Sequence, residues 1–231
     1  MKVSFKNILC TTDLSDHSNT AITYGAALAK EFNAKLYVCH IVDLTATVAY
    51  GEVLYAPVEI QEKTVAFARE QIERNMRAAS FEGETLISVG HPADEIASLV
   101  SEHAIDLVVS ATQGRSGLKR VILGSVTGRL MRSLECPFLI VRNLENTRDS
   151  LFKRILVGCD FSEDSNLAFQ YGLSLAQDFE SELHLVHVME TADYRDLIKR
   201  EKGAEIETPE HEEIREQLRR MLPEESYNWC Q

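Results

Sequence analysis

Two patterns of hydrophobic and polar positions alternate along the first 142 residues. Short continuous apolar runs predict buried strands, and between them apolar residues recur every three to four positions, as on one face of a helix. Strands that alternate with helices are typical of an α/β fold, in which a parallel sheet carries helices on both faces. The predicted strands are residues 7–13, 35–42, 85–89, 105–110 and 136–142, and the predicted helices are residues 16–32, 58–79, 94–103 and 126–135.

The beginning of this pattern occurs twice in the chain. The segment from Phe152 to His187 matches the segment from Phe5 to His40 without gaps, at an offset of 147 residues. A repeat of this length is not expected by chance, so the chain is interpreted as a tandem of one fold. The identical pairs include Asp13/Asp160, Ser15/Ser162, Ser18/Ser165, Asn19/Asn166, Tyr24/Tyr171, Gly25/Gly172, Leu28/Leu175 and Phe32/Phe179.

The second copy is shorter than the first. We expect a complete domain over residues 1–143, a polar linker over 144–151 and a partial second repeat over 152–231. About 80 residues bury little apolar surface for an independent domain, so we expect this repeat to pack against the first domain or a partner chain along the strand at 136–142. A truncated tandem protein is the alternative. The predicted elements of the second repeat are strands at 154–159 and 183–188 and helices at 164–179 and 209–221.

A glycine-bearing loop joins the fourth predicted strand to the helix that follows it. The loop runs from Ala111 through Gly114, Gly117 and Gly124 to Ser125. Glycines let backbone N–H groups approach an anion closely, and the first N–H groups of a helix are unpaired and carry partial positive charge. A phosphate fits such a strand–loop–helix unit. The alternative is that the glycines only turn the chain and Ser125 only caps the helix.

Composition excludes several classes of partner. The net charge of −12 argues against nucleic acid and against an anionic membrane surface, and no apolar run approaches the ~20 residues that span a bilayer. The five cysteines are scattered without a C-x-x-C pair, which favours free thiols in a reducing cytoplasm. His40, His91 and His187 stand without a second ligand at metal spacing, so no metal site is expected. We expect a cytoplasmic protein.

Several of these motifs, in this order, resemble the universal stress protein family in its tandem form. Ala111 stands where the family's loop has its first glycine, and the rest of the loop agrees with the family's spacing. The resemblance covers residues 5–142 completely and 152–222 in part. The matching features are Asp13 after the first strand, Gly90-x-Pro92 after the third, and Gly114 followed by nine residues, Gly124 and Ser125 after the fourth.

This resemblance implies a five-stranded parallel sheet of order 3-2-1-4-5, Rossmann-like, with a ligand crevice where the strand order reverses. It implies ATP as the ligand, with Mg²⁺ or Mn²⁺ held by the phosphates. Asp13 would accept hydrogen bonds from the ribose hydroxyls, and Thr12 and Ile41 would flank the adenine. Ala111 would narrow the site without closing it. The phosphates would be held by Gly114, Gly124, Ser125 and the backbone of Val126.

The implied function is that of a stress-response protein that works as a nucleotide-dependent switch or scaffold, as a homodimer or an intramolecular pseudo-dimer. No residue is evident that could activate an attacking water, so we expect at most slow ATP hydrolysis or self-phosphorylation at Ser125. The alternative is a nucleotide-free module that acts through dimerisation, which Ala111 favours. An adenylating α/β enzyme is disfavoured, because residues 11–15 contain no glycine for a phosphate loop.

Overall fold

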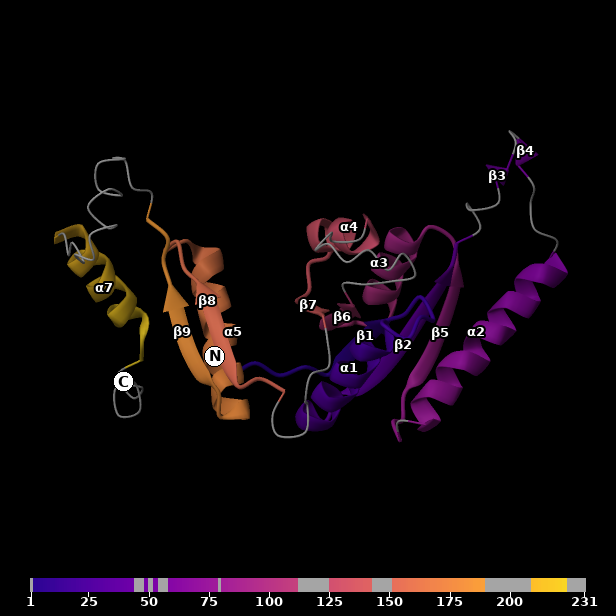
Figure 1. Cartoon of the computed structure of the whole chain (residues 1–231), viewed down its shortest axis with the longest axis horizontal. Helices are drawn as coiled ribbons and strands as arrows, with labels where there is room; N and C mark the ends of the chain where they lie inside the picture. Colours follow the sequence, from indigo (N-terminus) through magenta and orange to yellow (C-terminus); the bar gives the residue numbers. More distant parts are fainter. Residues whose placement is uncertain are drawn as a thin grey trace, which may run out of the picture. The chain divides into compact units, whose positions relative to one another are not determined.

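The structure is a computed structural model that describes residues 2–43, 48–49, 52–53, 58–78, 80–111, 125–142, 151–189 and 209–223. The chain divides into two compact units (Figure 1). The larger unit comprises Ser4–Asp149, and the smaller unit comprises Ser150–Gln231 together with Met1–Val3. Each unit is described by itself.

A five-stranded parallel sheet forms the centre of the larger unit. Its strands are β1 (Asn7–Thr11), β2 (Lys35–Val42), β5 (Glu84–Val89), β6 (Leu107–Ala111) and β7 (Phe138–Val141). They lie in the order β5-β2-β1-β6-β7, which confirms the order 3-2-1-4-5 that the resemblance implied. Strand β1 pairs with β2 on one side and with β6 on the other. The strand order therefore reverses at β1.

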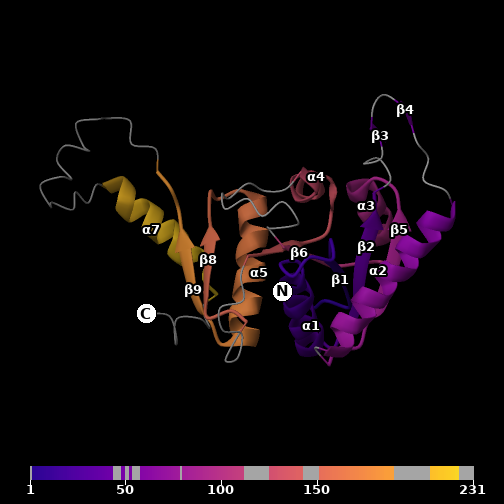
Figure 2. The same ribbon diagram turned by 45° about the vertical axis from the view of Figure 1, so that its right-hand side comes forward.

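Helices cover both faces of this sheet (Figures 1 and 2). The helices are α1 (Asn19–Phe32), α2 (Val58–Ala78), α3 (Pro92–Glu102) and α4 (Ser125–Ser133). On one face α1 packs against β1, where the Cys10 thiol contacts the carbonyl of Ala21 at 3.4 Å. The Nδ2 of Asn75 on α2 donates to Oδ1 of Asn19 on α1 at 3.0 Å, so these two helices are neighbours.

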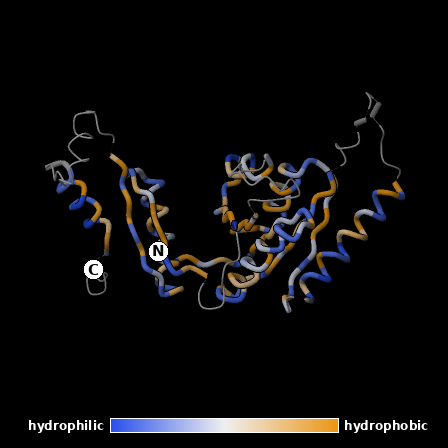
Figure 3. The backbone as a smooth tube through the Cα atoms, viewed as in Figure 1, coloured by the Kyte–Doolittle hydropathy of each residue, from blue (hydrophilic) through white to orange (hydrophobic). Residues whose placement is uncertain are grey.

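The opposite face of the sheet carries a hydrophobic cluster. Leu9 and Tyr37 point from β1 and β2 toward Ile96 of α3 and Leu130 of α4, which are almost completely buried. Figure 3 shows hydrophobic residues along the central strands, and alternating hydrophobic and hydrophilic residues along α2. This alternation is what a helix with one buried face requires. The described part of the cluster consists of Leu9, Tyr37, Cys39, Ile41, Ala93, Ile96, Ile105, Val108 and Leu130.

The smaller unit repeats the beginning of the larger one. Strand β8 (Arg154–Gly158), helix α5 (Glu163–Phe179) and strand β9 (Glu182–Val186) form a parallel β-α-β unit, and a further helix, α7 (Pro209–Met221), follows. Phe5 meets Phe32 edge-on with ring centroids 5.1 Å apart, and Phe152 meets Phe179 in the same way at 5.1 Å. Within the described residues, the second copy is thus a partial repeat in structure as well as in sequence.

The start of the chain contributes to the smaller unit. Val3 is buried, and its backbone N–H donates to the hydroxyl of Ser174 on α5 at 2.8 Å. The Nζ of Lys2 lies 3.7 Å from Oδ1 of Asp178 on the same helix. Lys2 and Val3 therefore belong to the same unit as α5.

The predicted bounds differ from the structure most clearly in the segment after β2 and at the start of α1. Between the strand predicted at 35–42 and the helix predicted at 58–79, where no strand was predicted, the structure has a short antiparallel hairpin of β3 (Val48–Ala49) and β4 (Glu52–Val53). Helix α1 begins at Asn19 instead of residue 16, because the serines before it bond to the local backbone: the Ser18 hydroxyl donates to the carbonyl of Ser15 at 2.8 Å. None of the described helices combines the length and apolar composition needed to cross a bilayer.

Candidate functional site

The carboxyl ends of β1 and β6 lie side by side at the point where the strand order reverses. Cys10 is in register with Val109, and the Thr11 hydroxyl donates to the Ser110 hydroxyl at 3.0 Å. In open parallel sheets, a crevice opens at such a reversal, because the loops that follow the two strands turn to opposite faces. The residues directly after β1 and at the end of β6 are therefore the candidate ligand-binding positions.

Thr12 follows β1 and is buried. Its backbone N–H donates to the carbonyl of Cys39 at 2.9 Å, and its hydroxyl lies 2.7 Å from the hydroxyl of Ser18 and accepts from the N–H of Leu14 at 3.0 Å. The carbonyl of Thr12 accepts a hydrogen bond from Nδ1 of His40 at 2.9 Å. The polar groups of Thr12 are thus used to fix the turn, and only its remaining surface is open to a ligand.

Asp13 is partly exposed and has a fixed orientation. Its Oδ1 accepts hydrogen bonds from the backbone N–H of Ser15 at 3.0 Å and from the Ser15 hydroxyl at 2.6 Å. Leu14, between them, has a φ of 66°, in the left-handed region. This is the local turn that an aspartate forms with the backbone two residues ahead. The turn holds the carboxylate at the carboxyl edge of the sheet.

Other candidate residues lie on neighbouring elements. Ile41 is near the end of β2, in register with Ser88, and packs in the hydrophobic cluster. Ala111 is the last residue of β6 and is partly exposed. Ser125 is the exposed first residue of α4, and Val126 packs against the cluster. The structure thus brings Thr12, Asp13, Ile41 and Ala111 to one edge of the sheet, whereas Gly114 and Gly124 lie outside the described residues.

The resemblance implies a nucleotide beside Ala111, and under that implication replacing Ala111 with glycine is expected to tighten the binding of Mg-ATP. The methyl group of Ala111 stands at the end of β6, where a loop glycine would let a nucleotide approach the backbone more closely. Isothermal titration calorimetry of Ala111→Gly should give a lower dissociation constant than the unchanged chain. An unchanged dissociation constant would show that this methyl group does not narrow the site.

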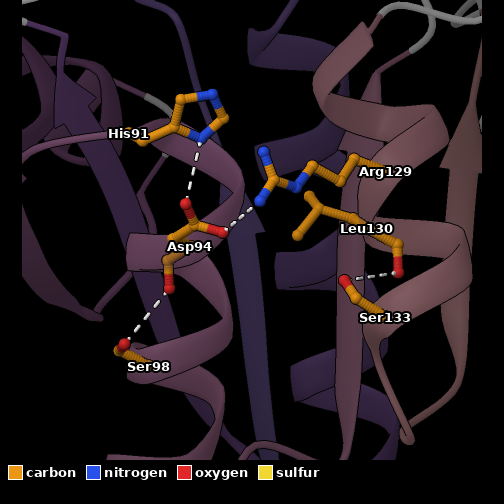
Figure 4. A network of polar contacts seen from close by, with 6 residues as sticks. All are labelled: His91, Asp94, Ser98, Arg129, Leu130 and Ser133. Atoms are coloured by element: carbon orange, nitrogen blue, oxygen red, sulfur yellow. Dashed lines mark hydrogen bonds and ion pairs between the residues drawn. The ribbon is translucent and has the colours of Figure 1, made fainter.

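A polar network joins α3 to α4 next to this edge (Figure 4). Oδ1 of Asp94 accepts from Nη2 of Arg129 at 2.8 Å, and Oδ2 of Asp94 lies 3.4 Å from Nδ1 of His91. All three side chains are about half exposed, so the ion pair contributes little to stability. The ion pair links the first turn of α3 to the middle of α4. Asp94 and Arg129 are 35 residues apart in the sequence, so no local sequence pattern could have identified this ion pair.

The second repeat forms the same turn without a following glycine loop. Oδ1 of Asp160 accepts from the N–H of Ser162 at 3.0 Å, and the carbonyl of Cys159 accepts from Nδ1 of His187 at 2.8 Å. The hydroxyl and N–H of Ser162, together with the hydroxyl of Ser165, lower the pKa of Asp160 to about 2. The turn is therefore a property of the repeated fold, and the loop after β6 is what distinguishes the first copy.

The described cysteines are free thiols, as predicted, and those beside the site are inert. Cys10, Cys39 and Cys159 are buried, and Cys136 is partly exposed. Burial raises the pKa of Cys10 far above its ordinary value and that of Cys39 to about 12, so both stay protonated at neutral pH. No group of three or more His, Cys, Asp or Glu side chains within the described ranges is arranged to hold a metal ion.

Comparisons with known proteins agree with this architecture. The sequence pattern of the universal stress protein family matches residues 4–142 and 151–227. Universal stress protein MJ0531 of Methanocaldococcus jannaschii is 32% identical over 146 residues, which are 60% of this chain and 82% of that protein. Universal stress protein YxiE of Bacillus subtilis is 32% identical over 147 residues, which are 60% of this chain and 99% of that protein.

Solved structures show the same fold. A universal stress protein from Archaeoglobus fulgidus superimposes with a TM-score of 0.63 at 22% identity, covering 85% of this chain and 72% of its own. Universal stress protein UspA from Lactobacillus plantarum superimposes with a TM-score of 0.52 at 26% identity, covering 61% of this chain and 100% of its own. Because the family pattern matches both repeats and the sheet has the order that the motifs implied, the chain belongs to the universal stress protein family.

Proposed function

We propose that this chain binds ATP at the carboxyl ends of β1 and β6, and that it acts as a nucleotide-dependent switch or scaffold in the stress response. The observation that carries the proposal is the oriented carboxylate of Asp13 beside the end of β6. A carboxylate accepts hydrogen bonds strongly, and the vicinal hydroxyls of a ribose are the donors that it would bind. Its place at the strand-order reversal is where such folds bind nucleotides.

The other parts of the nucleotide would lie on either side of the ribose. The adenine would pack near Thr12 and Ile41, at the ends of β1 and β2. The triphosphate would run toward the loop that follows Ala111, where the sequence supplies Gly114 and Gly124 and where α4 begins with the exposed Ser125. The N–H groups of that loop and helix, including that of Val126, would bind the phosphates. Mg²⁺ or Mn²⁺ would be held by the phosphates.

The chemistry of the proposed site favours a switch or scaffold over a fast enzyme. Hydrolysis of ATP needs a group that orients or deprotonates an attacking water, and neither the loop sequence nor the Asp13 turn supplies an evident one. Slow hydrolysis, or transfer of a phosphoryl group to Ser125, is the most that we expect. In this reading, nucleotide binding changes which partner the chain recognises, and the protein acts in the cytoplasm.

A homodimer through β7 is part of the proposal. Strand β7 is the last strand of the sheet, and within the described residues it pairs with β6 alone. Its side chains are mostly half-buried, which suits a surface that is completed by another chain. An unpaired strand edge is a natural place for such pairing. A nucleotide-free module that acts through this dimer is the second candidate, favoured by the methyl group of Ala111 at the mouth of the proposed site.

Replacing Asp13 with asparagine is expected to weaken Mg-ATP binding about tenfold to a hundredfold. The amide oxygen can still accept from the N–H of Ser15, so the turn is kept, but the negative charge is lost and an N–H₂ donor replaces one acceptor. Hydrogen bonds to charged groups contribute about 1.5–3 kcal/mol, and each 1.4 kcal/mol is a tenfold change in affinity. Calorimetric titration measures this difference directly.

Asp160→Asn is the matched control, because Asp160 forms the same turn in the repeat that has no glycine loop. Its affinity for Mg-ATP should equal that of the unchanged chain. Equal losses in the two variants would mean that the carboxylate acts on the whole fold and not on a nucleotide. An unchanged affinity in Asp13→Asn would remove Asp13 from the site.

A further inference from the structure

A contact between two sulfur atoms closes the end of β8 in the smaller unit. The thiol of Cys159, which is 5% exposed, lies 3.4 Å from the thioether sulfur of Met221, the last residue of α7. The repeat counterpart of Cys159 is Thr12, which carries a hydroxyl in place of the thiol. The second copy thus has a thiol where the first copy has a hydroxyl, and the contact with Met221 uses that thiol.

The surroundings shield Cys159 more than Met221. The Cys159 sulfur lies 3.9 Å from the hydroxyl of Ser165 on α5, and its carbonyl is bonded to His187, whose ring packs against Phe161 with centroids 4.8 Å apart. Met221 is only partly buried. A small oxidant such as a peroxide can thus reach the thioether, while the thiol beneath it is covered.

Helix α7 has features that would preserve its helical structure if it detached from the end of β8. Its charged side chains pair along its own surface: Arg220 with Glu216 at 3.5 Å, and Arg219 with Glu212 at 3.8 Å. Such pairs stabilise a helix by itself and are kept when it moves. Its less exposed side chains recur every three to four residues, at Ile214, Leu218 and Met221. These three side chains give α7 an apolar side that ends at the contact of Met221 with Cys159.

We propose that Met221 is an oxidation site, and that its conversion to the sulfoxide releases α7 from the end of β8 and exposes the Cys159 thiol. The thioether donates an electron pair to a peroxide, the O–O bond breaks, one oxygen becomes bonded to sulfur, and the other leaves as water. The sulfoxide is larger and far more polar than the thioether, so keeping it buried between α7 and the end of β8 costs free energy. This proposal does not depend on nucleotide binding.

The test uses the full chain and follows the alkylation of Cys159 by N-ethylmaleimide with site-resolved mass spectrometry. Samples are treated with hydrogen peroxide, the peroxide is removed with catalase, and thiols are reduced before labelling. Cys159 is expected to react at least tenfold faster after Met221 has been oxidised. Hydrogen exchange of α5 should stay unchanged, since only α7 is released. A collapse of protection across α5 would contradict the proposal, because the thiol would then be exposed by unfolding.

Two leucine variants separate the proposed site from general oxidation. Met221→Leu keeps an apolar side chain against Cys159 but has no sulfur to oxidise. Peroxide should therefore no longer accelerate the labelling of Cys159 in this variant. Met131→Leu removes a methionine that is 52% exposed on α4 of the larger unit, and the acceleration should remain. Met221→Gln, which places a polar side chain against the thiol, should give fast labelling without peroxide. Fast labelling of the untreated chain, or acceleration that persists in Met221→Leu, would overturn the proposal.

Discussion

Gly25→Val is expected to lower the free energy of unfolding of the larger unit by about 3 kcal/mol or more, which is a large fraction of the about 5–15 kcal/mol that an ordinary domain has. Gly25 lies on the buried side of α1, and a Cβ atom there would stand 2.0 Å from the sulfur of Cys10. Cys10 is completely buried on the central strand, so neither backbone can withdraw without opening the core. Circular dichroism and hydrogen exchange of β1 measure the loss.

The control for this variant is Gly158→Val in β8. A Cβ at Gly158 would meet nothing within 4 Å, so the same side chain should be tolerated there. Gly25→Ala combined with Cys10→Ala tests the cause, because removing the sulfur should recover part of the stability that Gly25→Ala alone loses. If Gly25→Val and Gly158→Val have equal stability, the close approach of α1 to β1 is not a constraint on the fold.

Gly124→Val is expected to abolish measurable Mg-ATP binding, with a loss of at least about a hundredfold in affinity. In the proposed site, the backbone at this position approaches the phosphates, and a branched side chain would keep the N–H groups away from them. Losing two hydrogen bonds to a charged group, at about 1.5–3 kcal/mol each, accounts for a loss of this size. Calorimetry reports the affinity, and circular dichroism reports whether the fold is kept.

Gly117→Val is the matched variant in the same loop, since Gly117 lies outside the family spacing of Gly114 and Gly124. It is expected to bind Mg-ATP as the unchanged chain does. Loss of binding in both variants would indicate that the loop tolerates no valine at all. Retention in both would remove the loop from the proposed site.

The fold was predictable because its core is encoded by continuous apolar runs. β2 at Lys35–Val42 and α7 at Pro209–Met221 have the predicted bounds. Two strands are shorter in the structure than predicted, because a polar residue or a proline lies at the end of the apolar run. β1 stops before Thr12, whose hydroxyl bonds to its own turn, and β7 begins after Pro137, which has no N–H for the ladder. The short hairpin of β3 and β4 was missed, since two residues are too few to show alternation.

The candidate site was predictable at the level of strand ends and not at the level of contacts. The sequence placed Asp13 after the first strand, and the known topology placed it beside the end of the fourth. The bonds of Thr11 to Ser110 and of His40 to the carbonyl of Thr12 join residues on different strands, so only the assembled sheet shows them. The roles of Gly114 and Gly124, and the division into domains at 143 and 152, stay predictions.

The most direct test of the account is calorimetric titration of the purified, nucleotide-stripped chain with Mg-ATP. We expect micromolar binding with one site per chain, because the second repeat has the aspartate turn but no glycine loop. The absence of binding heat at several temperatures, with the sheet intact by circular dichroism, would contradict the account. The chain would then be a nucleotide-free module that acts through dimerisation.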